Sequence, residues 1–151
     1  MPPSTADTLL SKIDFRRALV AILGQGYVGL PLARAFHAAG FRVLGFDVDP
    51  RKVQLLSAGK SYIKHIPSEA VSDMVRTGMF TAATDFSRIL ETNAVIICVP
   101  TPLNKNREPD ISFIIQTGES MAPHLRKGVL VVLESTTYPG TTDDDLRIVL
   151  E

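Results

Sequence analysis

The chain has 151 residues, 45% hydrophobic and 21% charged, and its 16 acidic side chains balance 16 basic ones, which is typical of one soluble globular domain. The balanced charge gives no field that would recruit nucleic acid or an anionic membrane, and no apolar run approaches the roughly 18 residues of a membrane span. The N-terminus lacks a signal-peptide pattern and the single cysteine can form no internal disulfide, which favours a cytoplasmic protein without nucleic-acid or membrane partners.

Short continuous apolar runs alternate with apolar residues at helical spacing. In chain order they predict strand 18–23, helix 27–39, strand 41–46, helix 50–58, loop 60–67, helix 68–77, strand 80–84, a short helix from 85, strand 94–99, loop 100–110, helix 111–124, strand 129–134 and a last helix from about 142. Strands that alternate with helices favour a parallel sheet covered on both faces. The expected fold class is therefore α/β, a doubly wound sheet of the Rossmann dinucleotide-binding type.

Local signals refine these boundaries. Asp49 before Pro50 is typical of a helix N-cap with proline at the first helical position. Thr142 and Asp145 have the spacing of a capping box for the last helix. Pro31 lies beyond the first turn of a helix that begins at residue 27, where it would forfeit a hydrogen bond.

No repeat or interdomain linker interrupts the pattern. We therefore assign residues 18–151 to one dinucleotide-binding domain. Residues 1–17 are assigned to an N-terminal arm, either loosely ordered or a short helix.

The stretch GQGYVG carries a G-x-G-x-x-G motif directly after the first predicted strand. Gly24 would allow a tight turn, Gly26 would let a pyrophosphate approach the backbone, and Gly29 would let helix and strand pack closely. The amides of Tyr27 and Val28, at the helix start, would then face the anion. The alternative is a glycine-rich turn that binds nothing.

Asp47 ends the second predicted strand, 23 residues after Gly24, where an acidic residue accepts hydrogen bonds from the adenosine ribose. A carboxylate there repels a 2′-phosphate and favours NAD over NADP. The neighbouring cations Arg51 and Lys52 favour NADP slightly. Lys52 is expected to reach the ribose or pyrophosphate, the alternative being a solvated helix charge, and Asp49 competes with Asp47 for the ribose.

Two later loops should meet the glycine-rich loop, because ligands of doubly wound sheets lie outside the carboxyl ends of the strands. Thr101 stands between two prolines, which restricts its backbone. Residues 134–142, ESTTYPGTT, bring several hydroxyl groups to the end of the fifth strand, Thr136 among them. Ordinary turn chemistry is the alternative for both loops.

Five segments together resemble the N-terminal NAD-binding domain of the nucleotide-sugar 6-dehydrogenases, the UDP-glucose/GDP-mannose dehydrogenase family: GQGYVGLPLA, GFDVD, SYIKHI, CVPTPLNKNREPD and ESTTYPGTT. The resemblance runs from about residue 18 to the end and is strongest to the UDP-N-acetylglucosamine 6-dehydrogenase branch. It implies NAD as the cofactor. It assigns the pyrophosphate to Tyr27 and Val28, the adenosine ribose to Asp47, the adenosine side to Lys52, and the nicotinamide half to Thr101 and Thr136.

The resemblance also implies the reaction of a longer parent enzyme. That enzyme would oxidise C6 of UDP-N-acetylglucosamine to the uronate with two NAD, through a thioester on a cysteine outside this chain, in the synthesis of precursors of bacterial surface polysaccharides. It would be a homo-oligomer, and the UDP-sugar would be held mostly outside this chain, which alone would be inactive. UDP-glucose, UDP-N-acetylgalactosamine or GDP-mannose are alternative substrates, and a non-catalytic NAD(H)-binding module is the alternative of another class.

No catalytic or metal-binding residue is expected in this chain. Cys98 lies in a predicted buried strand, where a free cysteine behaves as a small hydrophobic residue. His37 and His65 stand in no arrangement with ligand spacing, and His124, near a helix end, is expected to be a favourable terminal charge or a surface residue. The segments SYIKHI and NKNRE are candidates for shaping the nucleotide-sugar pocket.

Overall fold

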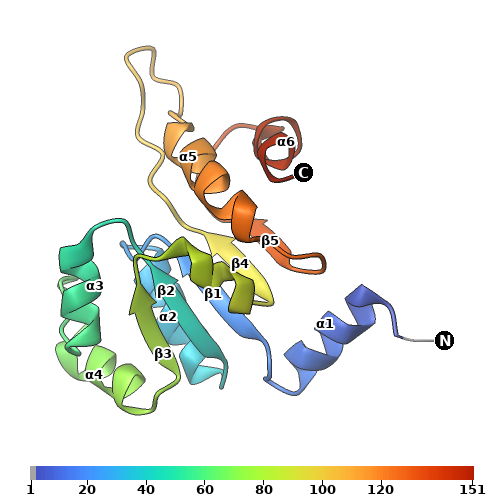
Figure 1. Ribbon diagram of the computed structural model, residues 1–151. Helices are drawn as coiled ribbons and strands as arrows, with labels where there is room; N and C mark the ends of the chain where they lie inside the picture. The colour runs from blue at the N-terminus through green and yellow to red at the C-terminus, as the bar shows by residue number, and fades with distance from the viewer. Residues whose placement is uncertain (1–2) are drawn as a thin grey trace.

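The computed structural model describes residues 3–151 (Figure 1). Its strands are β1 (Leu19–Leu23), β2 (Arg42–Phe46), β3 (Phe80–Ala83), β4 (Ala94–Ile97) and β5 (Leu130–Leu133). Its α-helices are α1 (Thr5–Asp14), α2 (Gly29–Ala38), α3 (Pro50–Ser57), α4 (Ser68–Arg76), α5 (Ser112–Met121) and α6 (Arg147–Leu150). Shorter helical turns are η1 (Phe86–Glu91), η2 (Ala122–His124) and η3 (Thr141–Leu146).

The five strands form one parallel sheet in the order β3-β2-β1-β4-β5, which confirms the doubly wound class. The chain proceeds outward from β1 through β2 to β3, then crosses back to β4 beside β1. Asn93 marks this return, because its side chain accepts a hydrogen bond from the Leu19 amide at 3.0 Å and its own amide donates to the Leu19 carbonyl at 2.9 Å. Strand order thus reverses between β1 and β4, the position at which such sheets bind ligands.

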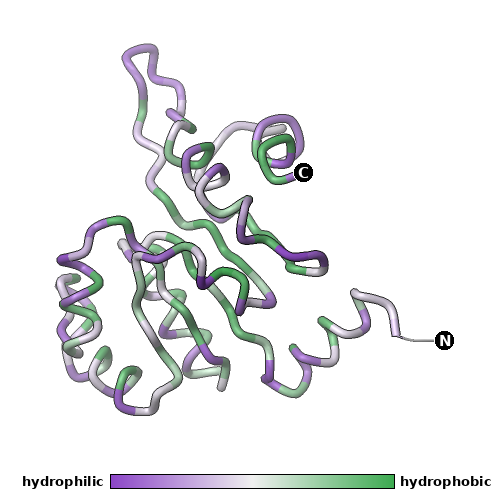
Figure 2. The backbone as a smooth tube through the Cα atoms, in the orientation of Figure 1, coloured by the Kyte–Doolittle hydropathy of each residue, from purple (hydrophilic) through white to green (hydrophobic). Residues whose placement is uncertain are grey.

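Both faces of the sheet are covered. Val20 and Ile22 point into a core shared with α2, α3 and α4, whereas Ala21 and Leu23 point into a second core shared with α5 and η1. Figure 2 shows why the sequence specifies this arrangement, since the central strands are the most continuously hydrophobic parts of the trace. A strand buried on both faces needs an unbroken apolar run rather than an alternating one.

The helix boundaries confirm two local predictions and correct one. Asp49 caps α3, accepting a hydrogen bond from the Arg51 amide at 2.9 Å. Although α2 is assigned from Gly29, the Leu30 amide already donates to the Gly26 carbonyl and the Leu32 amide to the Val28 carbonyl, each at 3.1 Å. Pro31 lies between them and has no N–H for the Tyr27 carbonyl, so it forfeits one hydrogen bond, as the sequence predicts.

The capping box predicted at Thr142 and Asp145 is wrong. The last helical segment begins after Gly140, whose left-handed conformation (φ 98°) turns the chain into η3 without a side-chain cap. The carboxylate of Asp145 instead accepts a hydrogen bond from the Tyr138 hydroxyl at 3.1 Å.

The N-terminal arm is helical over most of its described part, and its residues 1–2 lie outside the described residues. In α1, Ser4 and Asp7 form a reciprocal capping box, and Ile13 packs against the core on the α2 side. Leu10 and Phe15 remain exposed. Among residues 3–151, no helix has the length and apolarity needed to cross a bilayer.

Candidate functional site

A cavity of about 770 Å³ extends across the carboxyl ends of β2, β1, β4 and β5 and along one face of α5. Its size lies within the roughly 300–1,000 Å³ of small-molecule sites. Of the residues proposed from the sequence as cofactor contacts, only Gly29 does not line the cavity, because it lies behind the glycine-rich loop. The proposed contacts that do line the cavity are Gly24, Gly26, Tyr27, Val28, Asp47, Lys52, Thr101 and Thr136. The structure therefore brings together residues that are far apart in the sequence.

The three glycines of the first loop meet different structural demands. Gly24 has φ 92°, and a Cβ there would lie 2.6 Å from the Cys98 carbonyl oxygen. A Cβ at Gly29 would lie 1.7 Å from the Gly24 carbonyl oxygen, so the close approach of α2 to the loop requires glycine. Gly26 has no left-handed φ, and a Cβ added there would meet no atom within 4 Å, so the fold itself does not require glycine at this position.

The backbone amides that follow Gln25 are available to a ligand. Within residues 3–151, the N–H groups of Gly26, Tyr27 and Val28 donate no hydrogen bond to the protein. They directly precede the ten-residue helix α2, whose N-terminal end carries a partial positive charge. Unpaired amides at such a helix start form a site for an anionic group such as a phosphate.

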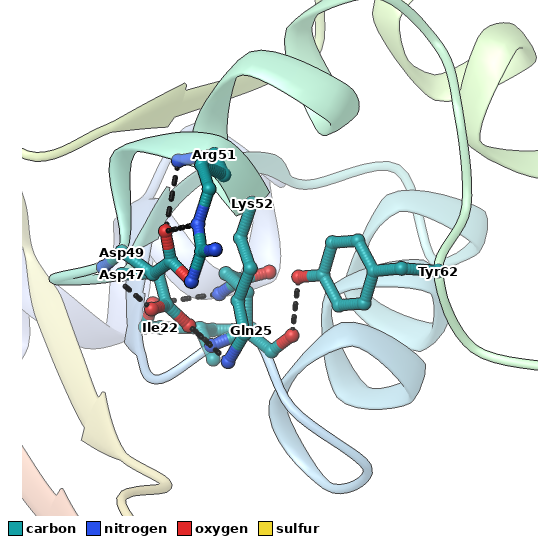
Figure 3. A network of polar contacts seen from close by, with 7 residues as sticks. All are labelled: Ile22, Gln25, Asp47, Asp49, Arg51, Lys52 and Tyr62. Carbon is teal, nitrogen blue, oxygen red and sulfur yellow. Dashed lines mark hydrogen bonds and ion pairs between the residues drawn. The ribbon is translucent and has the colours of Figure 1, made fainter.

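Asp47 connects this loop to the end of β2 (Figure 3). Its carboxylate is only 7% exposed, accepting hydrogen bonds from the amides of Gln25 at 2.9 Å and Asp49 at 3.0 Å. Lys52 Nζ lies 3.3 Å from Asp47 Oδ2. Asp47 is thus held rigidly at the cavity wall with its charge partly balanced, a suitable acceptor for the hydroxyls of a sugar.

Asp49, the competing carboxylate, is engaged elsewhere. Its side chain caps α3 and pairs with the Arg51 guanidinium at 3.1 Å. The hydrogen bond from Arg51 lowers the pKa of Asp49 below its usual value. Asp49 and Arg51 bind each other, and neither lines the cavity.

The other end of the cavity is formed by the loops after β4 and β5. Ser135 Oγ donates to the Val99 carbonyl at 2.7 Å, which ties the two loops together next to Thr101 and Thr136. Phe113 and Thr117 close this end from α5. The sequence-based interpretation did not identify the α5 wall, because its residues read only as parts of an amphipathic helix.

Two further residues support the first loop in ways that the sequence did not predict. The Gln25 side chain is fully buried and donates to the Ile22 carbonyl at 2.8 Å, directly against Gly45 of β2. The Tyr62 hydroxyl donates to the Gln25 backbone carbonyl. Gln25 occupies an unspecified position of the glycine motif, so only its burial reveals its role.

Cys98 should react poorly with thiol reagents. Burial, and then the charge of Glu134, raises the pKa of Cys98 to about 11. At pH 8 the native chain should therefore react with a disulfide reagent more than about a hundredfold more slowly than the chain unfolded in urea. Stopped-flow absorbance measures both rates, and rapid labelling of the native chain would contradict the assignment of Cys98 as an unreactive packing residue.

Comparison with known proteins identifies the family of the chain. Residues 18–151 match the family model described as "UDP-glucose/GDP-mannose dehydrogenase family, NAD binding domain". The chain is 36% identical over 124 residues to a UDP-N-acetyl-D-mannosamine dehydrogenase of Salmonella typhimurium, covering 82% of this chain and 29% of that protein. It is 37% identical over 127 residues to a UDP-N-acetyl-D-glucosamine 6-dehydrogenase of Salmonella typhi, covering 83% and 29%.

A solved structure shows the same fold. The crystal structure of a ternary complex of GDP-mannose dehydrogenase from Pseudomonas aeruginosa superposes with a TM-score of 0.82 at 31% identity, covering 87% of this chain and 31% of that one. The chain therefore spans about three tenths of the length of the relatives it matches. The chain belongs to the UDP-glucose/GDP-mannose dehydrogenase family and carries its NAD-binding domain, so its cofactor is NAD.

Proposed function

We propose that the cavity holds NAD, with the pyrophosphate on the amides of Gly26, Tyr27 and Val28. The adenosine ribose then binds Asp47 and Lys52, and the nicotinamide half lies against the loops that follow β4 and β5. The observation that carries this proposal is the group of free amides beside a buried, prepositioned carboxylate. When bound, NAD accepts a hydride from the substrate, whereas the chain binds and orients it.

The electrostatics of the adenosine end favour NAD over NADP. A 2′-phosphate would enter next to the Asp47 carboxylate, which is buried and already holds two amides. Lys52 is paired with Asp47 and Arg51 with Asp49, so both nearby cations are engaged. The cations that favoured NADP in the sequence are therefore partly neutralised by carboxylates.

For the parent enzyme, we propose oxidation of C6 of UDP-N-acetylglucosamine to the uronate with two NAD, in a cytoplasmic homo-oligomer that supplies surface-polysaccharide precursors. The segments shared with that branch and the Salmonella typhi relative support this substrate. A UDP-N-acetylmannosamine substrate is the second candidate, supported by the Salmonella typhimurium relative. The chain alone should turn over neither sugar, since Cys98 is its only cysteine and is buried.

Binding of NAD to the 151-residue chain tests the cofactor site directly. In ¹⁵N-resolved NMR titrations, NAD should shift the amide signals of Gly26, Tyr27 and Val28 most strongly. NADP should bind at least about tenfold more weakly, because the added phosphate meets Asp47. Shifts confined to the hollow between β5 and α6 would contradict the proposed site.

The substrate is tested with the complete parent enzyme. Absorbance at the NADH band should rise with UDP-N-acetylglucosamine, with two NADH formed per sugar, in a panel of UDP- and GDP-sugars. Oxidation of UDP-N-acetylmannosamine alone would select the second candidate. Oxidation of UDP-glucose alone would contradict both.

A further inference from the structure

The connection between α3 and α4, residues 58–67, returns to the glycine-rich loop. Its Tyr62 hydroxyl donates to the backbone carbonyl of Gln25, 37 residues earlier in the chain. Its His65 ring stacks on the ring of Tyr27, with centroids 6.1 Å apart and planes inclined by 29°. Neither Tyr62 nor His65 lines the cavity, so this connection supports the loop from outside.

The connection is itself firmly anchored. Ile63 and Ile66 are buried in the core beneath α2 and α4, and Tyr62 packs against the same core. Burial, followed by the charges of Asp47 and Asp49, raises the pKa of Tyr62, so the hydroxyl keeps its proton at all physiological pH values. Tyr62 is therefore a permanent hydrogen-bond donor on a rigid support.

This hydrogen bond determines the direction of a neighbouring amide. In a trans peptide the C=O and N–H groups point in opposite directions, and residues 3–151 contain no cis peptide. The Gln25 carbonyl points to Tyr62 (Figure 3). The N–H of Gly26 belongs to the same trans peptide and therefore points away from Tyr62. That N–H has no partner among residues 3–151 and belongs to a residue that lines the cavity.

We propose that Tyr62 is a positioning residue of the dinucleotide site, whose hydroxyl holds the Gln25–Gly26 peptide so that the Gly26 amide faces the pyrophosphate. This role depends on the NAD site proposed above. The Tyr62 ring also lies 5.8 Å from Lys52 Nζ, which binds Asp47 at 3.3 Å. A single side chain thus supports the phosphate end and the ribose end of the site.

Replacing Tyr62 by phenylalanine separates these two contributions. Tyr62→Phe removes the hydroxyl but keeps the ring beside Lys52, so the ribose end is preserved. The freed peptide can rotate, and the Gly26 amide loses its fixed direction. Affinity for ADP, which carries the diphosphate, should fall about five- to tenfold, whereas affinity for adenosine should stay within about twofold.

The experiment compares ADP and adenosine as probes in ¹⁵N NMR titrations of the 151-residue chain. Tyr138→Phe is the matched control, because Tyr138 donates its hydroxyl to Asp145 and does not line the cavity. The control should bind both probes as the wild type does. In the Tyr62→Phe chain the shift of the Gly26 amide on adding ADP should be smaller than in the wild type. Urea unfolding of each variant shows that the compared chains are folded.

Each outcome discriminates. A selective loss of ADP affinity supports the positioning role. Unchanged affinity for both probes, or an equal loss for both, overturns that role while the NAD site stands. If the wild-type chain binds neither probe at the glycine-rich loop, the proposed NAD site fails and the role of Tyr62 fails with it.

Discussion

Gly29→Ala should destabilise the domain by more than about 3 kcal/mol, the upper end of the cost of overpacking a core. The added Cβ would lie 1.7 Å from the Gly24 carbonyl oxygen, and the Gly24 backbone is itself pressed against Cys98. Because backbone atoms on both sides are fixed by β1 and β4, the clash cannot be relieved by rotating a side chain. Urea unfolding followed by circular dichroism measures the loss, and a midpoint like that of the wild type would contradict this packing.

Gly26→Ala is the matched control, since it makes the same chemical change three residues earlier. Space is open around that position and φ is not left-handed, so stability should change by less than about 1 kcal/mol. Affinity for NAD should nevertheless fall at least about tenfold, because the methyl group occupies the space of the pyrophosphate. Unchanged NAD affinity in Gly26→Ala would place the pyrophosphate elsewhere.

Asp47→Ala should reduce affinity for NAD about tenfold to a hundredfold, the effect of losing hydrogen bonds to a charged acceptor. It should also lower the free energy of unfolding by about 2 kcal/mol, because the amides of Gln25 and Asp49 lose their acceptor. Isothermal titration calorimetry and urea unfolding measure the two losses. Wild-type affinity in the variant would remove Asp47 from the ribose site.

Asp49→Ala controls for the loss of a neighbouring carboxylate. It removes a helix cap and the partner of Arg51, at a cost of about 1 kcal/mol in stability. Since Asp49 does not line the cavity, affinity for NAD should remain within about twofold of wild type. A larger loss there would indicate that the two carboxylates share the ribose.

The alternation of strands and helices was predictable because each buried strand is a continuous apolar run and each helix is amphipathic. Gly24, Gly26 and Asp47 were predictable as cavity residues because their roles depend on short spacing next to the first two strands, whereas Gly29 packs α2 against the loop outside the cavity. Whether they bind NAD as assigned stays a prediction.

Other features lay beyond local patterns. The Thr142–Asp145 spacing matched a capping box, but the left-handed Gly140 starts the helix differently and Tyr138 takes up Asp145. The segment SYIKHI was assigned a role only as a candidate for the sugar pocket. Its contact with the glycine-rich loop could not be predicted, because the tyrosine binds the backbone carbonyl of Gln25, 37 positions away, and no local pattern marks such a contact. The residues of α5 that line the cavity could not be predicted either, because which of them face the cavity depends on how the helix packs against the sheet.

The return of the chain to Asn93 beside Leu19 governs how the domain assembles. Residues 74 positions apart must meet before the central strand gains its second neighbour, and no hairpin within residues 3–151 offers the sheet a shorter route. Such distant pairings slow folding, because the chain loses the conformational entropy of loop closure before the contacts that stabilise the closed loop have formed. In a nascent chain that has emerged only as far as β3, one edge of β1 would have unpaired backbone N–H and C=O groups. Such an exposed strand edge can pair with other chains and promote aggregation during synthesis.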